Sequence, residues 1–196
     1  MPGPLVCRQA SPRDLDAVLA LIEQRAVWLH GRGSDQWNHG LDYRKKIAKR
    51  VERGYTWLVE DRAVPVATGT LFRRSRSVLW TEEEMEQPTL FAWKMATALS
   101  RSGEGLTEVL FHWVQDWAAR IDLDWVRWSV WGASRGLHAY YQQCGAELVR
   151  VVEVPQREPV ALFQLPARRS PSVALEVKTV IDYSREGASV LAAAAA

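Results

Sequence analysis

Apolar residues recur at two different periods along this chain of 196 residues. A spacing of three to four residues predicts an amphipathic helix, and alternation predicts a strand with one buried face. The helical spacing occurs in residues 12–29, 41–53, 106–119 and 134–144. The alternating or strand-like pattern occurs in residues 5–10, 55–60, 64–72, 90–97, 124–131, 147–154 and 160–165. This order of elements predicts a mixed α/β domain with a central sheet and flanking helices.

Residues with special backbone preferences mark the ends of several predicted elements. Ser11 followed by Pro12 suits the start of the first helix, because proline at the first helical position loses no hydrogen bond. Gly145 has the place of a C-cap glycine after the last helix. The Gly-rich, polar residues 30–40 predict a loop, and the acidic residues 81–87 are expected to be irregular.

The C-terminal residues differ in composition from the rest of the chain. Residues 168–172 resemble a linker, residues 173–181 have the pattern of one additional strand, and the chain ends in a run of alanines. We therefore expect one domain over residues 1–165, followed by a C-terminal extension over residues 166–196.

The composition, with 47% apolar and 24% charged residues, is typical of a soluble globular protein. No apolar run approaches the roughly 20 residues that cross a bilayer, and the N-terminus lacks the pattern of a secretory signal. Cys7 and Cys144 are too few for a disulfide framework, and no His, Cys or Asp pair has metal-ligand spacing with a partner. We therefore expect a cytoplasmic protein with no membrane partner and no metal.

The charge balance and the tryptophan content narrow the expected partners. The net charge is only +2, so the basic residues 44–50 and 73–76 are interpreted as solvated surface. A nucleic-acid binder is the least favoured alternative, because no aromatic and basic recognition motif accompanies these residues. The ten tryptophans predict a large aromatic core or an aromatic-lined cleft.

The Gly-rich residues 102–107, Ser-Gly-Glu-Gly-Leu-Thr, lie between a predicted strand and a predicted helix. Glycines allow backbone N–H groups to turn toward a phosphate, and the helix N-terminus adds partial positive charge. The turn lacks the Gly-Lys-Ser/Thr ending of a nucleotide-hydrolase phosphate loop, and it lacks the third glycine and distant acid of the dinucleotide fold. It predicts an anion-binding turn, and a plain turn is the alternative.

Over residues 5–165 the chain resembles the GNAT superfamily of acetyltransferases. In that family a strand leads into an Arg/Gln-x-x-Gly-x-Gly/Ala turn and a long helix, and a later helix carries the pattern Asn-x-x-Leu-x-x-Tyr-Tyr-x-x-x-Gly-Phe. The corresponding residues here are 90–97, 102–107 and 134–146. The resemblance implies a centrally splayed sheet (the acyl-CoA N-acyltransferase fold) and acetyl-CoA as cosubstrate. It also implies transfer of an acetyl group, by direct attack, to a primary amine of a small molecule or peptide.

The same resemblance assigns a set of residues to the cofactor. The turn would hold the CoA pyrophosphate, the strand before it would offer main-chain groups to the pantetheine and the thioester, and the later helix would lie beside the sulfur. The residues that match these positions are Met95, Ala96, Thr97, Arg101, Ser102, Gly103, Glu104, Gly105, Leu106, Thr107, Ser134, Leu137 and Tyr141.

The chain departs from the family pattern at four of these motif positions. Ser102 replaces Arg or Gln, Thr107 replaces Gly or Ala, Ser134 replaces Asn, and Ala146 replaces Phe. The first two changes affect the pyrophosphate turn directly. They motivate a second hypothesis, a GNAT-like module that binds acyl-CoA or a partner protein without turnover.

Two kinds of proton transfer are needed for the predicted reaction. The resemblance places Tyr141 near the CoA sulfur, where a phenol, with its pKa of about 10, is protonated at neutral pH and can act as a general acid. The alternative is that Tyr141 only packs in the core, and Tyr140 is an equal candidate for that packing role. Glu82 and Glu83, in the acidic segment before the fourth strand, are candidates for the base that accepts a proton from the amine, and a solvated surface segment is the alternative.

The acceptor is expected to bind near the loop between the first two helices. Asp35, Gln36 and Trp37 are the candidate substrate-binding residues, and the Trp37 ring suits an apolar or cationic group. The sequence predicts either a monomer or a homodimer.

Overall fold

The computed structural model describes residues 5–34, 37, 42–73, 78–155, 158–170 and 177–180. These residues contain one sheet of eight strands. The strands are β1 (Leu5–Gln9), β2 (Thr56–Asp61), β3 (Val64–Phe72), β4 (Thr89–Thr97), β5 (Trp125–Trp131), β6 (Glu147–Val152), β7 (Val160–Pro166) and β8 (Val177–Val180). The helices are α1 (Leu15–His30), α2 (Tyr43–Glu52), α3 (Glu82–Glu86), α4 (Leu106–Arg120) and α5 (Arg135–Gln143), with short 3-10 helices at Pro12–Asp14 and Leu99–Arg101. These elements confirm the predicted mixed α/β fold.

The strands lie in the order β6-β7-β5-β4-β3-β2-β1-β8. Neighbours are antiparallel, except that β4 pairs with β5, and β1 with β8, in parallel. The strand predicted within residues 173–181 therefore exists as β8, and its register with β1 runs from Leu5 opposite Val177 to Arg8 opposite Val180. The proposed domain boundary after residue 165 remains a prediction.

The parallel pair at the centre of the sheet is joined over only part of its length. Three residue pairs connect β4 to β5, and they are Thr89 with Trp125, Leu90 with Val126 and Phe91 with Arg127. Beyond Phe91 the two strands separate, so the described part of β4 has a free edge toward β5. This divergence confirms the predicted splay.

Arg127 holds β4 and β5 together at the end where the two strands are still paired. Its guanidinium donates to the Thr89 hydroxyl at 3.3 Å, to the Gln164 side-chain oxygen at 3.2 Å, and to Gln87 and the Glu84 carbonyl. Burial lowers the pKa of Arg127 from its ordinary value, although the nearby Glu84 opposes that shift. One buried cation thus links β4, β5, β7 and the segment before β4.

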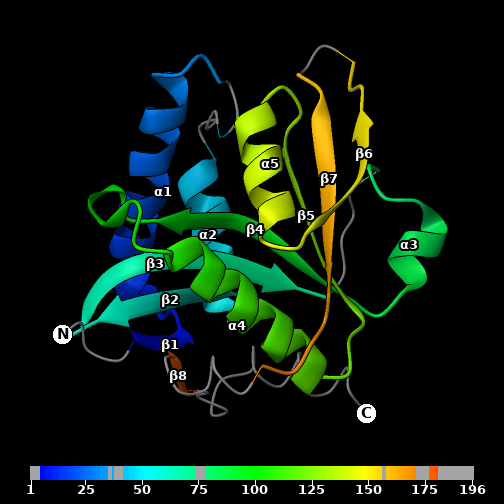
Figure 1. Cartoon of the computed structure of the whole chain (residues 1–196). Coiled ribbons are helices and arrows are strands. Elements are labelled where there is room, and N and C mark those ends of the chain that lie inside the picture. The colour runs from blue at the N-terminus through cyan, green and yellow to red at the C-terminus, as the bar shows by residue number, and fades with distance from the viewer. Residues whose placement is uncertain are drawn as a thin grey trace.

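Helices cover both faces of the sheet (Figure 1). On the face of α4 and α5, the largest core cluster joins these helices to the sheet, with Trp57 packed edge to face on Trp113 and Trp117. On the face of α1 and α2, a second cluster contains Ile22, Ile47 and Ala96. The two clusters place β4 between two differently built walls.

One local feature differs from the expectations. Residues 81–87, expected to be irregular, contain α3, because Thr81 and Glu84 form a capping box: the Thr81 hydroxyl accepts from the Glu84 N–H at 3.2 Å, and a Glu84 carboxylate oxygen accepts from the Thr81 N–H at 2.8 Å. Ser134 occupies the N-cap of α5 without a side-chain cap hydrogen bond. Gly145, by contrast, has φ of +86° just after α5, as a C-cap glycine requires.

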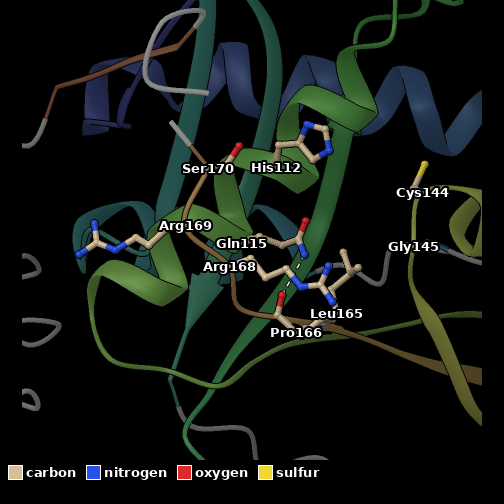
Figure 2. Close-up of a pocket in the computed structure, with 9 residues that line it drawn as sticks. All are labelled: His112, Gln115, Cys144, Gly145, Leu165, Pro166, Arg168, Arg169 and Ser170. Carbon is tan, nitrogen blue, oxygen red and sulfur yellow. Dashed lines mark hydrogen bonds between the residues drawn. The ribbon is translucent and has the colours of Figure 1, made fainter. Parts of the chain in front are cut away.

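After β7 the chain turns back along α4. The Gln115 side-chain nitrogen donates to the Pro166 carbonyl at 2.8 Å, and the Ser170 N–H donates to Asp116 at 2.9 Å. Figure 2 shows Gln115, Pro166 and Ser170 at a pocket between α4 and the end of β7, and the volume of this pocket is about 270 Å³. The start of the C-terminal extension is therefore attached to α4.

Candidate active site

A cleft of about 1360 Å³ lies where β4 and β5 separate. Its walls come from these two strands and from α1, α4 and α5, with contributions from α2 and the segment before β7. Half of the tryptophans line it, namely Trp28, Trp37, Trp93, Trp128 and Trp131. The sequence predicted an aromatic core or an aromatic cleft, and the protein contains both.

A bulge in β4 shapes the floor of the cleft. Thr70 pairs with Trp93 and Thr68 pairs with Ala96, so Gly69 alone lies opposite two residues, Lys94 and Met95. Lys94 has a left-handed backbone with φ of +54°. An extra residue in one strand reverses the alternation of side chains beyond it. As a result Met95 packs on the α4 face with the largest core cluster, and Ala96 belongs to the cluster under α1 and α2.

The glycine turn leads directly into α4 on one side of the cleft. Gly103 and Gly105 have φ of +85° and +72°, which an L side chain rarely adopts, so the turn requires glycine at both positions. Gly105 is the N-cap of a 15-residue helix, whose free N–H groups and dipole favour an anion. Thr107 lines the cleft, and Leu106 is buried under the helix.

Arg101, which precedes the turn, is held by two carboxylates. Its guanidinium donates to Asp61 at 2.9 Å and to Glu104 at 2.5 Å. These hydrogen bonds raise the pKa of Arg101, with Glu104 contributing most. The arginine therefore braces the turn against β2, and it is not among the residues that line the cleft. Ser102, Gly103 and Glu104 are exposed beside it.

Tyr141 extends from α5 into a cage of aromatic rings at the wall of the cleft. Its ring packs edge to face against Phe111 at 5.3 Å, Trp128 at 5.5 Å and Phe163 at 5.4 Å between centroids. Burial raises the pKa of Tyr141 above that of an ordinary phenol, while Arg25 acts in the opposite direction. The phenol is therefore protonated at neutral pH, as a general acid must be.

Tyr140 connects α5 to the start of α4. The side chains of Thr107 and Cys144 both act on its hydroxyl, with Thr107 lowering and Cys144 raising the pKa of Tyr140. Burial is the main reason that the pKa of Tyr140 is raised. The side chain of Thr107, where the family pattern has a small residue, thus lies near the Tyr140 hydroxyl.

The structure brings several other predicted cofactor residues to the same cleft. Met95 and Thr97 line it from β4, and Ser134 and Leu137 line it from the start of α5. Ala96 is buried with 1% exposure and pairs with β3. Six of the residues predicted to hold the cofactor thus line the cleft, and they are Met95, Thr97, Thr107, Ser134, Leu137 and Tyr141, whereas residues 101–105 are not among the lining residues.

The predicted general bases lie elsewhere. Glu82 and Glu83 are exposed on α3, which Figure 1 shows near β6, and they are not among the cleft-lining residues. Their neighbour Glu84 binds Arg150 of β6 through two hydrogen bonds of 2.6 and 2.7 Å. The structure therefore does not bring Glu82 or Glu83 together with Tyr141.

Of the predicted acceptor residues, Trp37 lines the cleft. Asp35 and Gln36 lie outside the described residues. Trp37 has φ of +73° and presents its ring to the Lys94 amine, 4.4 Å from the ring centroid. The loop between α1 and α2 therefore contributes at least this one ring to the cleft.

Two cations of the cleft were not predicted. Arg25 of α1 donates to both the carbonyl and the hydroxyl of Thr97 at 3.0 Å, at the end of β4. Lys94 extends from the bulge toward α2. No simple sequence signal marks Arg25, because it is one of several charged residues on a helix surface. The position of Lys94 depends on the bulge.

Among the described residues, no group of three or more His, Cys, Asp or Glu side chains is arranged to hold a metal ion. Within the same part of the chain, no helix has the length and apolar character needed to cross a membrane.

No family model matches the chain. YesJ of Bacillus subtilis strain 168, an uncharacterised N-acetyltransferase, is 23% identical over 142 residues, which are 69% of this chain and 78% of that protein. The fold is similar to a GNAT-family acetyltransferase from Listeria monocytogenes 4b F2365, with a TM-score of 0.67, 20% identity, and coverage of 83% of this chain and 94% of that one. It is also similar to yncA of Salmonella typhimurium, a putative acetyltransferase solved with its cofactor acetyl-CoA, with a TM-score of 0.60, 16% identity, and coverage of 86% and 97%.

Proposed function

Given that this chain has the fold of the GNAT acetyltransferases, we propose that it is an acetyl-CoA-dependent N-acetyltransferase. In this proposal it transfers the acetyl group to a primary amine of a small molecule or peptide. The observation that carries the proposal is the position of Tyr141 in the wall of a large cleft formed by the splay of β4 and β5. The similar fold of yncA, solved with acetyl-CoA, supports the choice of cosubstrate.

Two parts of the cofactor, the pyrophosphate and the pantetheine, find complementary groups in or beside the cleft. The N-terminus of α4 and the turn at Gly103 and Gly105 suit the pyrophosphate, because unpaired N–H groups and the helix dipole attract anions. The free edge of β4 beyond Phe91 offers main-chain hydrogen bonds to the pantetheine amides. Leu110 and Leu137 provide apolar surface for its methylene groups.

The reaction then proceeds by direct attack. The neutral amine nitrogen bonds to the thioester carbonyl carbon, and a main-chain N–H near the bulge at Met95 stabilises the developing oxyanion. The carbon–sulfur bond breaks as the tetrahedral intermediate collapses, and the nitrogen, which became positively charged on attack, releases its extra proton to solvent. The departing thiolate takes a proton from the Tyr141 hydroxyl, which solvent later restores. We assign no side chain to the removal of the proton from the ammonium, since Glu82 and Glu83 lie outside the cleft lining.

The remaining parts of the proposal concern the cellular setting. The protein acts in the cytoplasm, as a monomer or a homodimer, on acetyl-CoA and an amine, without a metal and without nucleic acid. The absence of an obvious membrane or metal requirement in the sequence motivates these assignments.

One observation favours a second candidate, a module that holds acyl-CoA without turnover. Arg101 and the turn residue Glu104 pair with each other, and Ser102 replaces the usual Arg or Gln. The turn therefore presents an extra carboxylate and no unpaired arginine to the pyrophosphate. The pyrophosphate is then fixed less firmly at this turn, so that acyl-CoA is held without the alignment that transfer requires.

Release of the CoA thiol separates the two candidates. The protein is incubated with acetyl-CoA and each member of a panel of primary amines, and free thiol is followed over time. The proposed enzyme releases thiol with at least one amine, and mass spectrometry finds the matching acetamide. Saturable binding of acetyl-CoA, without thiol release above the amine-free control for any amine, is the outcome that favours the second candidate.

A further inference from the structure

Lys94 occupies an unusual place in the cleft. Its amine lies 4.4 Å from the Trp37 ring centroid, 5.4 Å from that of Tyr43 and 5.6 Å from that of Trp93. The side chain is half-buried and lines the cleft. The three rings belong to the wall under α1 and α2. Lys94 is therefore on the opposite side of β4 from Met95, α4 and Tyr141, which form the side of the acyl donor.

Lys94 has no anionic partner among the described residues, and no hydrogen bond to its amine is formed there. Burial lowers the pKa of Lys94 to about 7, whereas the ring faces favour its charged form. A cation that is taken from water is normally paired, because an unpaired buried charge is costly. The missing partner is therefore expected to arrive with a ligand.

The other charges of the cleft point to the same kind of ligand. Arg25 and Lys46 also line it, and Glu158, next to β7, is the only acidic residue among the lining residues that the structure describes. A polyamine entering this cleft meets three cations and one exposed carboxylate. A ligand that carries an anionic group is instead attracted by these three cations.

We propose that the acceptor carries a carboxylate as well as its amine, and that the Lys94 ammonium binds this carboxylate. The substrate class is therefore an amino acid or a related amino carboxylate. Trp37, Tyr43 and Trp93 enclose the ion pair and exclude water from it, and the apolar walls receive the rest of the molecule. This inference rests on the proposed acetyl transfer for the role of the ligand, but the carboxylate site itself is tested by binding alone.

Product-like ligands provide the direct test. N-acetylglycine, N-acetyl-L-methionine and N-acetyl-L-phenylalanine are each compared with the corresponding carboxamide, which has the same shape but no charge. Binding is measured by calorimetry or NMR at about pH 6.5, with and without CoA. A charged hydrogen bond contributes roughly 1.5–3 kcal/mol, so at least one carboxylate is expected to bind about 10-fold to 100-fold more tightly than its amide.

Two matched variants locate the preference. Lys94→Met keeps a side chain of similar length without charge, and it is expected to bind the carboxylate and the amide about equally. Lys46→Met removes an exposed charge from the same cleft and is expected to keep the preference. Three results would overturn the inference: no carboxylate binds better than its amide, Lys94→Met keeps the preference, or both variants lose it equally, as bulk charge would require.

The pH dependence gives a second readout. The groups around Lys94 are Tyr43, Lys46 and Arg50 of α2, Arg25 of α1, and Glu23, which acts on Tyr43. Burial raises the pKa of Tyr43, and arginines stay charged, so Lys94 titrates first near neutrality. Carboxylate binding should weaken as the pH rises above about 7, because Lys94 must then take up a proton, and this slope should disappear in Lys94→Met.

The inference and the proposed function can fail separately. If acetyl-CoA does not bind the wild-type protein, the acetyltransferase assignment fails while the carboxylate preference is still measurable. If acetyl-CoA is turned over but uncharged or cationic amines are better acceptors than amino carboxylates, the function stands and the carboxylate site is wrong.

Discussion

Gly69 of β3 and Met95 of β4 approach each other so closely that a Cβ atom on Gly69 would overlap the Met95 sulfur. This contact lies at the bulge, where Gly69 faces two residues of β4. The methionine side chain lies over the neighbouring strand at this point, in the space that a side chain on residue 69 would take. The present position of Met95 in the cleft therefore depends on the small residue opposite it.

Gly69→Ala should consequently displace the Met95 side chain and destabilise the protein by only about 1 kcal/mol, because the flexible methionine can adopt another rotamer. Chemical denaturation measures the loss. Met95→Ala removes the overlapping atoms, so the double variant should be more stable than the sum of the two single losses predicts. Simple additivity of the two substitutions would show that Met95 does not constrain position 69.

Tyr141→Phe should lower kcat about 100-fold or more, because the thiolate loses its proton donor while the aromatic cage stays filled. The dissociation constant of acetyl-CoA should change little. Since burial raises the pKa of Tyr141, the alkaline fall in kcat is expected above about pH 10 and should vanish in the variant. Tyr140→Phe serves as the control, and an unchanged kcat in Tyr141→Phe would refute the general-acid role.

The pair of Glu84 and Arg150 attaches α3 to β6. Its hydrogen bond from Arg150 is the main reason that the pKa of Glu84 is lowered to about 2. A depressed carboxyl pKa contributes stability that is present above the ordinary value of about 4.3 and lost as the pH falls toward the depressed value. Glu84→Gln should therefore cost on the order of 2 kcal/mol at neutral pH and almost nothing near pH 2, measured by denaturation at both pH values. A cost that is the same at both pH values would contradict this account.

Two glycines near the cleft offer a matched comparison. A Cβ on Gly132 would overlap the backbone carbonyl of Pro159, which also accepts a hydrogen bond from the Gly132 N–H at 2.7 Å. Gly136 lies in α5 with open space around it. Gly132→Ala should thus cost about 2 kcal/mol or more, whereas Gly136→Ala should stabilise the protein by about 0.5–1 kcal/mol through helix propensity. Thermal unfolding measures both, and equal effects would argue against the close approach of β5 to the start of β7.

The sequence pattern was sufficient for most of the fold because the core elements are strongly periodic. The apolar residues of α4 recur every three to four positions, and the structure contains the helix that this spacing predicts. The short helix α3 was missed although Thr81 and Glu84 form a capping box, because four glutamates within five residues resemble a solvated loop. Local capping chemistry determined that segment more than its composition did.

The candidate site was predictable only where it depends on local motifs. Tyr141 and Thr107 reach the cleft because each has a fixed place on a helix next to a recognisable turn. Lys94 was not predictable in the same way. Strict alternation would put it on the α4 face with Leu90 and Ala92, and the bulge instead turns it toward Trp37. A left-handed backbone at a lysine is a tertiary feature that no alternation pattern reveals.

Titration of the protein with acetyl-CoA decides whether the cleft is a cofactor site. We expect saturable binding of one acetyl-CoA per chain. The same titration should show at least about tenfold weaker binding when Leu137, in the cleft wall, is replaced by arginine, because the bulkier charged side chain fills the pantetheine path. Lack of saturable binding at millimolar acetyl-CoA would contradict both the enzyme and the acyl-CoA-binding alternative.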